Sequence, residues 1–163
     1  MNYSLVDPKD PILKSVAEPF DFSNPEIAPL DLAEGLSELM LSYNGLGIAA
    51  PQCGIPFRVL VLCGEELIPI FNPKIVDVSE ETVLLEEGCL TYPGLVVKVR
   101  RPKKIKVRYA EPNGNVVTKI FDGMTARILQ HEIDHLDGIC FIDRASMIYK
   151  EQALKKWKKI KRG

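Results

Sequence analysis

The sequence has few of the features that mark secreted, membrane or nucleic-acid-binding proteins. It lacks a run of the roughly 18 apolar residues that a membrane-spanning helix needs, and no apolar segment follows a basic start, as in a secretory signal. Four cysteines in 163 residues are too few for a disulfide scaffold. A formal net charge of −1 shows no overall bias toward nucleic acid. We therefore expect a cytoplasmic protein with no membrane association.

Charge is distributed unevenly along the chain. The segment from Lys150 onward holds seven basic residues and one acid, so it carries a net charge of about +6 and leaves about −7 on residues 1–149. A helix over roughly 147–160 is predicted here. One stripe of this helix carries Leu154, Trp157 and Ile160. This stripe would dock on the domain and leave the lysines in solvent. The alternative role for such a basic tail is a contact with ribosomal RNA.

The length and 46% hydrophobic content suit one domain spanning residues 1–163. The stretch to about Pro29 is predicted to be irregular and to wrap the surface. Helices are predicted over residues 30–43, 122–136 and 147–160, with Asp122 and Gly138 bounding the second. Strands are predicted over residues 58–63, 68–78, 82–85, 95–99, 105–109 and 116–121, with turns at Pro93-Gly94 and Pro112-Asn113-Gly114. This order predicts an α+β fold, with mixed or antiparallel sheets around a central helix and a C-terminal helix.

The only two histidines lie in one five-residue run, His131-Glu132-Ile133-Asp134-His135. Residues four apart share a face of a helix, so both imidazoles can bind one metal ion. Glu132 projects beside them and can accept a proton from a metal-bound water. The pattern predicts a mononuclear metallohydrolase that needs a third protein ligand.

Three positions are considered for the third ligand. In the extended peptidase pattern HExxHxxGxxH, Gly138 is in place, but Phe141 stands where the third histidine belongs. Glu151 is the only glutamate downstream, and it lies in the lysine-rich helix, where we expect it to be solvated. Cys89 is the better candidate, because the polar, glycine-containing segment Glu86–Thr91 allows a close approach to the helix. Two imidazoles and one thiolate leave an open position for water, as in a catalytic site.

The other cysteines are interpreted as small hydrophobic residues in or near the core, namely Cys53, Cys63 and Cys140. Two alternatives to a catalytic site with one cysteine remain. If Cys140 completed a closed shell with Cys89 and the histidines, the protein would be a structural zinc module in which Glu132 has no role. A true endopeptidase would need a third ligand that the sequence does not supply.

The segment Gly45-Leu46-Gly47-Ile48-Ala49-Ala50-Pro51-Gln52 contains a G-x-G-x-x-A string that is not a dinucleotide fingerprint. It follows a predicted helix rather than a strand, and Pro51 and Gly54 would break any helix after it. Its glycines more naturally let the backbone run close to an extended substrate. Gln52 offers an amide as donor and acceptor, with a surface turn residue as the alternative interpretation.

Together these three segments resemble the peptide deformylase family, in which the motifs read GxGxAAxQ, EGCLS and HExDH in this order. Here they stand as Gly45–Gln52, Glu87–Thr91 and His131–His135. The segment Asp10–Lys14 and the length also look like the bacterial form. Thr91 replaces the usual serine; both carry a hydroxyl, so little effect is expected. The resemblance implies a metal-dependent hydrolase that removes the formyl group from N-terminal formyl-methionine of new polypeptides and releases formate.

The resemblance also implies roles for individual residues. Cys89, His131 and His135 would bind the metal, and Glu132 would be the general acid and base. Gln52 and the backbone N–H of Leu90 would stabilise the developing oxyanion. The expected cofactor is one divalent metal ion per chain, Fe(II) first, with Ni(II), Co(II) and Zn(II) as alternatives, because His₂Cys ligation does not by itself select the metal.

A pocket for the methionine side chain is expected from Gly47, Leu90, Ile128 and His131. The substrate backbone is expected to pair with Gly45–Gly47 and Ile48 as a strand added to a sheet edge. The expected partners are N-formylmethionyl nascent peptides, and the protein is expected to be a monomer.

Overall fold

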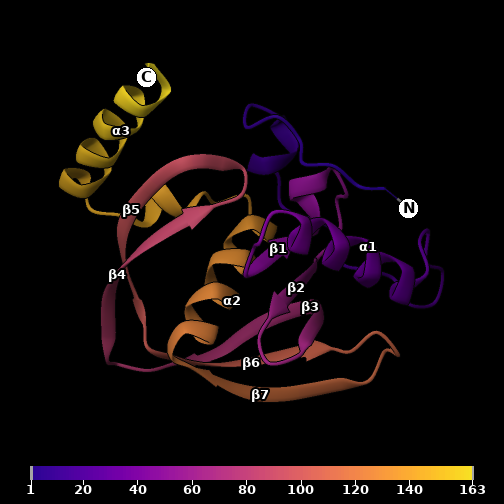
Figure 1. Cartoon of the computed structure of the whole chain (residues 1–163). Helices are drawn as coiled ribbons and strands as arrows, with labels where there is room; N and C mark the ends of the chain where they lie inside the picture. The colour runs from indigo at the N-terminus through magenta and orange to yellow at the C-terminus, as the bar shows by residue number, and fades with distance from the viewer. Residues whose placement is uncertain (1, 163) are drawn as a thin grey trace.

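The structure is a computed structural model that describes residues 2–162, and it confirms the α+β fold (Figure 1). Its helices are α1 (Pro29–Ser42), α2 (Gly123–Leu136) and α3 (Met147–Arg162), with the 3₁₀ helices η1 (Pro11–Lys14), η2 (Ala50–Cys53) and η3 (Phe141–Arg144). Its strands are β1 (Gly47–Ala49), β2 (Val59–Cys63), β3 (Leu67–Val78), β4 (Thr82–Cys89), β5 (Tyr92–Pro102), β6 (Lys104–Ala110) and β7 (Val116–Asp122). Among residues 2–162, no helix combines the length and the apolar character needed to cross a membrane.

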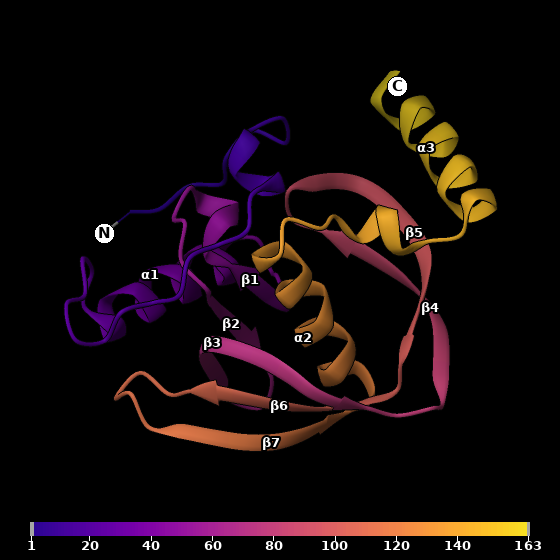
Figure 2. The same cartoon turned by 180° about the vertical axis from the view of Figure 1, so that it is seen from behind.

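Two antiparallel sheets flank the central helix α2. The larger sheet has the strand order β1-β2-β3-β6-β7, while β4 and β5 form a separate two-stranded hairpin. Figures 1 and 2 show α2 between the hairpin and the larger sheet, with α1 and α3 on the outside. The edge strand β1 also contacts α2. The fold therefore brings the histidine-bearing helix, the hairpin and the Gly47–Ala49 edge together in the middle of the molecule.

The helix α2 begins and ends where the sequence predicts. The Asp122 carboxylate accepts a hydrogen bond from the backbone N–H of Gly123 at 2.7 Å. Beyond Leu136 the chain turns through Gly138 with φ +72°, where an added Cβ would lie 2.6 Å from the Lys14 carbonyl oxygen. Only glycine satisfies both requirements. The end of α2 therefore packs closely against the N-terminal segment at Lys14.

Hydrophobic packing fixes the position of α2. Its apolar side chains pack on the larger sheet, in a cluster that includes Leu129 and Leu136, both completely buried. Burying one such leucine contributes about 1.5–3 kcal/mol. A second cluster joins α1 to the other face of β1–β3, and a third joins β5 to η3 and α3. The α2 helix also buries six polar or charged side chains: Arg127, Gln130, His131, Glu132, Asp134 and His135. Burying charged groups is costly unless they have partners. A cluster of six such side chains on one helix therefore indicates a candidate functional site.

The segment before α1 confirms the prediction of an irregular N-terminal stretch. Between residue 2 and Pro29 the only regular element is η1, and the segment is held by the buried side chains of Leu13, Ala17 and Phe20. The helix α1 starts at Pro29 and stops before Asn44, whose φ of +55° ends the helical path.

The turn predicted at Pro93-Gly94 is wrong. The hairpin turns at Leu90-Thr91, where Cys89 pairs with Tyr92, and Pro93-Gly94 lies inside β5. The register shifts between Gly88 and Cys89, so the Pro-Gly pair forms an irregularity in the strand instead of a chain reversal. The predicted strand 82–85 ended too early, and the predicted strand 95–99 began too late and ended too early, because the residues beyond these limits interrupt the apolar pattern. The turn over Pro112-Asn113-Gly114, between β6 and β7, is as predicted.

The C-terminal helix α3 docks on β5 as predicted, with one correction. The Trp157 indole N–H donates to the Pro93 carbonyl oxygen at 2.9 Å, and Ala153 is buried. Leu154 packs half-buried in the same cluster. Ile160, however, is 53% exposed. The docking stripe therefore ends near Trp157, and the last turns of the helix stand in solvent.

Candidate metal centre

Three predicted ligands converge at the centre of the molecule. Cys89 ends β4, while His131 and His135 lie one turn apart on α2. Their ligand atoms all lie within 4.8 Å of one another, and Cys89 Sγ is 3.2 Å from His135 Nε2. Both histidines are almost completely buried, and the thiol side chain is half-buried. This spacing suits one metal ion with two nitrogen ligands and one sulfur ligand.

Within residues 2–162, these three side chains are the only group of at least three His, Cys, Asp or Glu residues with metal-binding geometry. Cys140 does not belong to this group, and it packs half-buried in the cluster between β5 and α3. Cys53 and Cys63 likewise pack at the edge of the cluster beneath α1. The geometry therefore disfavours a closed shell with a fourth protein ligand.

Glu132 lies beside the three candidate ligands, buried at the wall of a cavity. Only 4% of the residue is exposed, and Oε1 is buried without a hydrogen-bond partner in the described chain. Burial raises the pKa of this carboxyl group to about 7. An orphaned carboxylate oxygen at this depth needs a donor, and a water molecule in the metal site would supply it. The residues present therefore fit a hydrated metal ion.

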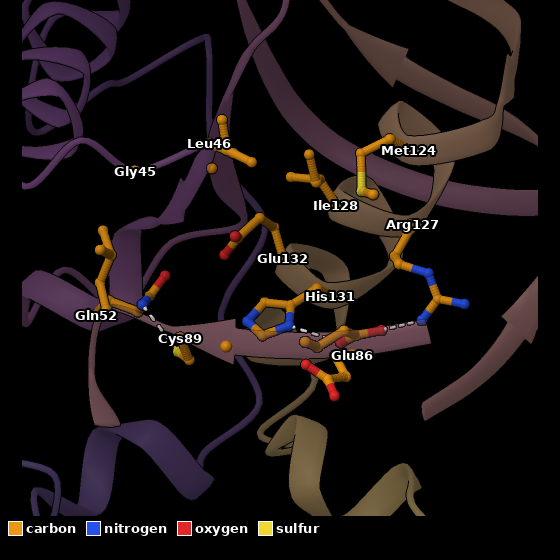
Figure 3. A pocket seen from close by; sticks show the side chains of 14 residues that line it. Gly45, Leu46, Gln52, Glu86, Cys89, Met124, Arg127, Ile128, His131 and Glu132 are labelled. Carbon is orange, nitrogen blue, oxygen red and sulfur yellow. Dashed lines mark hydrogen bonds and ion pairs between the residues drawn. The ribbon is translucent and has the colours of Figure 1, made fainter. Parts of the chain in front are cut away.

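Gln52 reaches the centre from η2, on the opposite side from α2. Its Oε1 accepts a hydrogen bond from the Ala49 backbone N–H at 2.9 Å. Its Nε2 donates to Thr91 Oγ1 at 3.0 Å. The same nitrogen lies 3.6 Å from Cys89 Sγ (Figure 3). Gln52 is 1% exposed, so the surface-turn interpretation is wrong. The structure places the amide N–H₂ beside the metal ligands.

A cavity of about 310 Å³ opens onto this centre. Its walls include Gly45, Gly47, Leu90, Ile128 and His131, five of the six residues named for substrate binding. The sixth, Ile48, is completely buried in the core, and only its backbone belongs to the β1 edge. Figure 3 also shows Leu46 and Met124 at the cavity, two exposed apolar residues that the sequence did not single out.

Two glycines leave room for the cavity and its carboxylate. A Cβ at Gly47 would lie 2.7 Å from Glu132 Oε2 and 2.8 Å from Ile128 Cγ2. A Cβ at Gly45 would lie 2.8 Å from Leu90 Cδ1. A Cβ at either glycine would come within 3.0 Å of a neighbouring side chain, so the glycines let the backbone approach the cavity wall closely; that this backbone runs along an extended substrate stays a prediction.

Glu87 orients one of the histidines. Its Oε1 lies 3.0 Å from His131 Nδ1, so Nε2 is the nitrogen left for the metal. Glu87 also accepts two hydrogen bonds from Arg101, at 2.6 and 3.0 Å, and one from Arg127 at 2.6 Å. Although burial works against its charge, the hydrogen bonds from His131 and Arg101 lower the pKa of Glu87 to about 2. An ionised acceptor of this kind fixes both the position and the tautomer of the ring.

The two histidines differ in protonation. Burial, with the nearby charges of His131 and Arg101, lowers the pKa of His135 to about 3, so this ring is neutral as a ligand must be. Burial disfavours the charged form of His131 as well, but its hydrogen bonds with Cys89 and Glu87 outweigh that effect and raise its pKa to about 10. A metal ion bound at His131 would therefore displace a proton, so its affinity would depend on pH.

Asp134 extends the same network behind α2. It accepts from Arg101 at 2.9 Å and from Arg144 at 2.9 and 3.2 Å. Sequence reasoning gave no role to Glu87, Arg101, Arg127 or Asp134. A signal was present for two of them: Arg101 continues the buried alternation of Leu95, Val97 and Val99 along β5, and Arg127 lies one helical turn before His131.

Comparison with known proteins agrees with this geometry. Residues 3–151 match the family described as Polypeptide deformylase. A peptide deformylase of Carboxydothermus hydrogenoformans is 41% identical over 150 residues, covering 91% of this chain and 97% of that protein. One of Natranaerobius thermophilus is 43% identical over 145 residues, covering 88% of this chain and 92% of the relative.

Solved structures show the same fold. The crystal structure of a peptide deformylase from Thermotoga maritima superposes with a TM-score of 0.82 at 38% identity, covering 90% of this chain and 99% of that one. A class I type b peptide deformylase from Acinetobacter baumannii, solved with Met-Ala-Ser bound, gives a TM-score of 0.83 at 35% identity, covering 88% and 98%.

Proposed function

The chain belongs to the polypeptide deformylase family, and on that basis we propose that Cys89, His131 and His135 hold its metal ion while Glu132 moves the proton. The protein is a metal-dependent hydrolase that removes the N-formyl group from newly synthesised polypeptides. The observation that carries the residue assignment is the convergence of three ligand atoms beside the orphaned Oε1 of Glu132.

The reaction follows from the positions of four groups. When bound, the metal ion supplies a Lewis acid that makes water nucleophilic near neutral pH and polarises the formyl oxygen. Glu132 accepts a proton from the attacking water and returns it to the departing amine. The formyl carbon carries only hydrogen, so the attack is sterically open. Gln52 Nε2 and the Leu90 backbone N–H donate to the oxygen on which charge develops. Removing one such donor typically lowers the rate on the order of 10²-fold or more.

Substrate is proposed to bind as an added strand. The edge strand β1 and the neighbouring Gly45–Gly47 backbone border the cavity, and its lining includes Ile128 and Leu90, which suit a methionine side chain. A relative from Acinetobacter baumannii was solved with Met-Ala-Ser bound, which supports a peptide as the ligand. The reaction is tested with formyl-methionyl and acetyl-methionyl peptides as a matched pair. We expect formate and free amine from the first and no cleavage of the second, because a methyl group blocks the attacked carbon.

For the metal, we propose Fe(II), with Ni(II), Co(II) and Zn(II) as alternatives that the same ligands accept. The support is the family membership together with one thiolate and two imidazoles, a set that binds all four ions. The test is metal analysis of protein prepared anaerobically, followed by reconstitution of the metal-free protein with each ion. Activity with Fe(II) that decays in air, at a rate that anaerobic handling suppresses, is the expected result.

A contact between α3 and ribosomal RNA is proposed as a second role for the basic tail. All of its basic residues except Lys150 are exposed, and its net charge suits phosphate binding. The test is co-sedimentation with ribosomes over a range of salt concentrations. Lys155, Lys158 and Lys159 are changed to glutamine in one variant, and the exposed Lys9, Lys74 and Lys119 in a control of equal charge. Loss of binding in the first variant alone is expected.

We also propose a single domain that acts as a cytoplasmic monomer. Two of the three hydrophobic clusters share strands β1, β2, β3 and β6, and β5 of the third cluster contacts α2 of the first, which supports one folding unit. Light scattering of the purified protein tests the monomer, with a mass near 18.3 kDa expected. A mass of twice that value would contradict it.

A further inference from the structure

The two ends of the Gln52 amide are held by different parts of the chain. Its oxygen takes the Ala49 N–H from its own segment, at 2.9 Å. Its nitrogen donates to Thr91 Oγ1 across the cleft, at 3.0 Å. Gln52 is 1% exposed and Thr91 3%, so water does not compete for either contact. The amide therefore has one orientation, because the flipped form would turn its N–H₂ toward the Ala49 N–H and leave that buried N–H without an acceptor, whereas the Thr91 hydroxyl can meet either end of the amide.

Thr91 lies in the turn of the β4–β5 hairpin. Cys89 pairs with Tyr92, so Leu90 and Thr91 form the two-residue turn between β4 and β5. Three consecutive residues thus deliver a metal ligand, a backbone N–H at the cavity wall and the hydroxyl that holds Gln52. The Gln52 amide on η2 is thereby held by the same hairpin end that carries the Cys89 sulfur, although Gln52 and Cys89 are far apart in sequence.

We propose, on the basis of the proposed function above, that Thr91 is a positioning residue for the Gln52 oxyanion donor. Its hydroxyl accepts one hydrogen of the Nε2 group, and the second hydrogen is directed toward Cys89 Sγ, 3.6 Å away, where the oxygen on which charge develops would accept it instead. The β-branch of threonine makes χ1 stiff, so the hydroxyl is held in place more firmly than a serine hydroxyl would be. Thr91 contributes to the rate through Gln52 alone.

The kinetic test uses Thr91→Val, which keeps the shape and removes the hydroxyl, with Thr91→Ser as the conservative control. Both are made in the wild-type and the Gln52→Ala backgrounds, and metal content is measured in all of them. In the wild-type background we expect Thr91→Val to lower kcat about tenfold, the order of one neutral hydrogen bond, with KM little changed. Thr91→Ser should keep most of the rate. In the Gln52→Ala background, Thr91→Val should have no further effect.

A second readout needs no turnover. In the metal-free protein, the side-chain NH₂ of Gln52 is followed by ¹⁵N NMR. We expect two resolved proton resonances with slow solvent exchange in the wild type and in Thr91→Ser, and faster exchange in Thr91→Val. Equal losses of kcat in both backgrounds, or an unchanged exchange rate in Thr91→Val, would overturn the proposal. Wild-type protein that releases no formate while the NMR result holds would instead refute the proposed function and leave the Thr91–Gln52 contact standing.

Discussion

Glu87 and His131 lie 3.0 Å apart through a carboxylate oxygen and the imidazole Nδ1, and this contact decides which ring nitrogen faces the metal position. Arg101 and Arg127 hold the carboxylate from two other directions. The ligand is therefore oriented by a partner that never needs to touch the metal. This buried group of four side chains connects β4, β5 and α2, so the metal site and the fold depend on the same contacts.

Changing Glu87 to glutamine should weaken metal binding by about 10–100-fold, because the ring loses an ionised partner that fixes its tautomer. Competition with a chelator measures the dissociation constant. Glu86→Gln is the matched control, since Glu86 is the adjacent residue of β4 and is exposed. Equal affinities in the two variants would show that the Glu87 contact does not tune the site.

Changing Cys89 to alanine should remove metal binding, whereas Cys140→Ala should keep one metal ion per chain. Only Cys89 lies within ligand distance of both histidines. Metal content by mass spectrometry, with thermal unfolding of each variant, measures the outcome. If Cys140→Ala also lost the metal, and if a chelator unfolded the metal-bound wild type, the closed structural zinc shell would be the correct description.

Changing Gly47 to alanine should lower kcat/KM on the order of 10²-fold, because the new Cβ would lie 2.7 Å from the Glu132 carboxylate and must displace it. The overpacking should also cost about 1–3 kcal/mol of stability. Gly64→Ala is the control, since the nearest atom to its Cβ would be 3.6 Å away, at ordinary contact distance. Steady-state kinetics with a formylated peptide measure both, and normal activity in Gly47→Ala would show that the cavity tolerates the methyl group.

The stability of the metal-free protein should depend on pH through Glu132. Its pKa is about 7 in the folded chain against 4.5 for the ordinary group. Between these values the folded state keeps a proton that the unfolded state has released. The contribution of Glu132 is thus fully present below pH 4.5 and is lost as pH rises toward and through 7, on the order of 3 kcal/mol in total. Glu132→Gln cannot titrate, so urea unfolding at pH 5 and pH 7.5 should show a smaller loss in this variant. Parallel losses in the two proteins would contradict the assignment.

Most of the fold could be predicted because its signals are local. The apolar periodicity of α1, the N-cap at Asp122 and the stop at Gly138 all act within a few residues. The hairpin was harder, because its register depends on the pairing of Cys89 with Tyr92, which a turn rule applied to Pro93-Gly94 cannot see. The strand β1 was missed because three residues, including a glycine, carry too little pattern.

In the site, likewise, the residues that belong to local motifs could be predicted, and their partners from distant segments could not. The metal ligands, Glu132 and Gln52 could be named from motif spacing and family resemblance, and the structure brings them together. The partners that hold them could not be named, since Glu87 meets Arg101 and Arg127 only through the packing of β4 on β5 and α2. The replacement of the usual serine by Thr91 was expected to have little effect, and the contact of Thr91 with Gln52 was not predicted, because it depends on a turn that was expected at Pro93-Gly94 instead.

Glu132 is proposed to act as the acid and base of this metal-dependent deformylase without being a metal ligand. The most direct test measures formate release from a formyl-methionyl peptide by protein loaded anaerobically with Fe(II) or Ni(II), for the wild type and Glu132→Ala. Metal content is measured on the same samples. We predict formate from the wild type and almost none from Glu132→Ala, with one metal ion per chain in both. Formate from Glu132→Ala at the wild-type rate, or none from the metal-loaded wild type, would contradict the account.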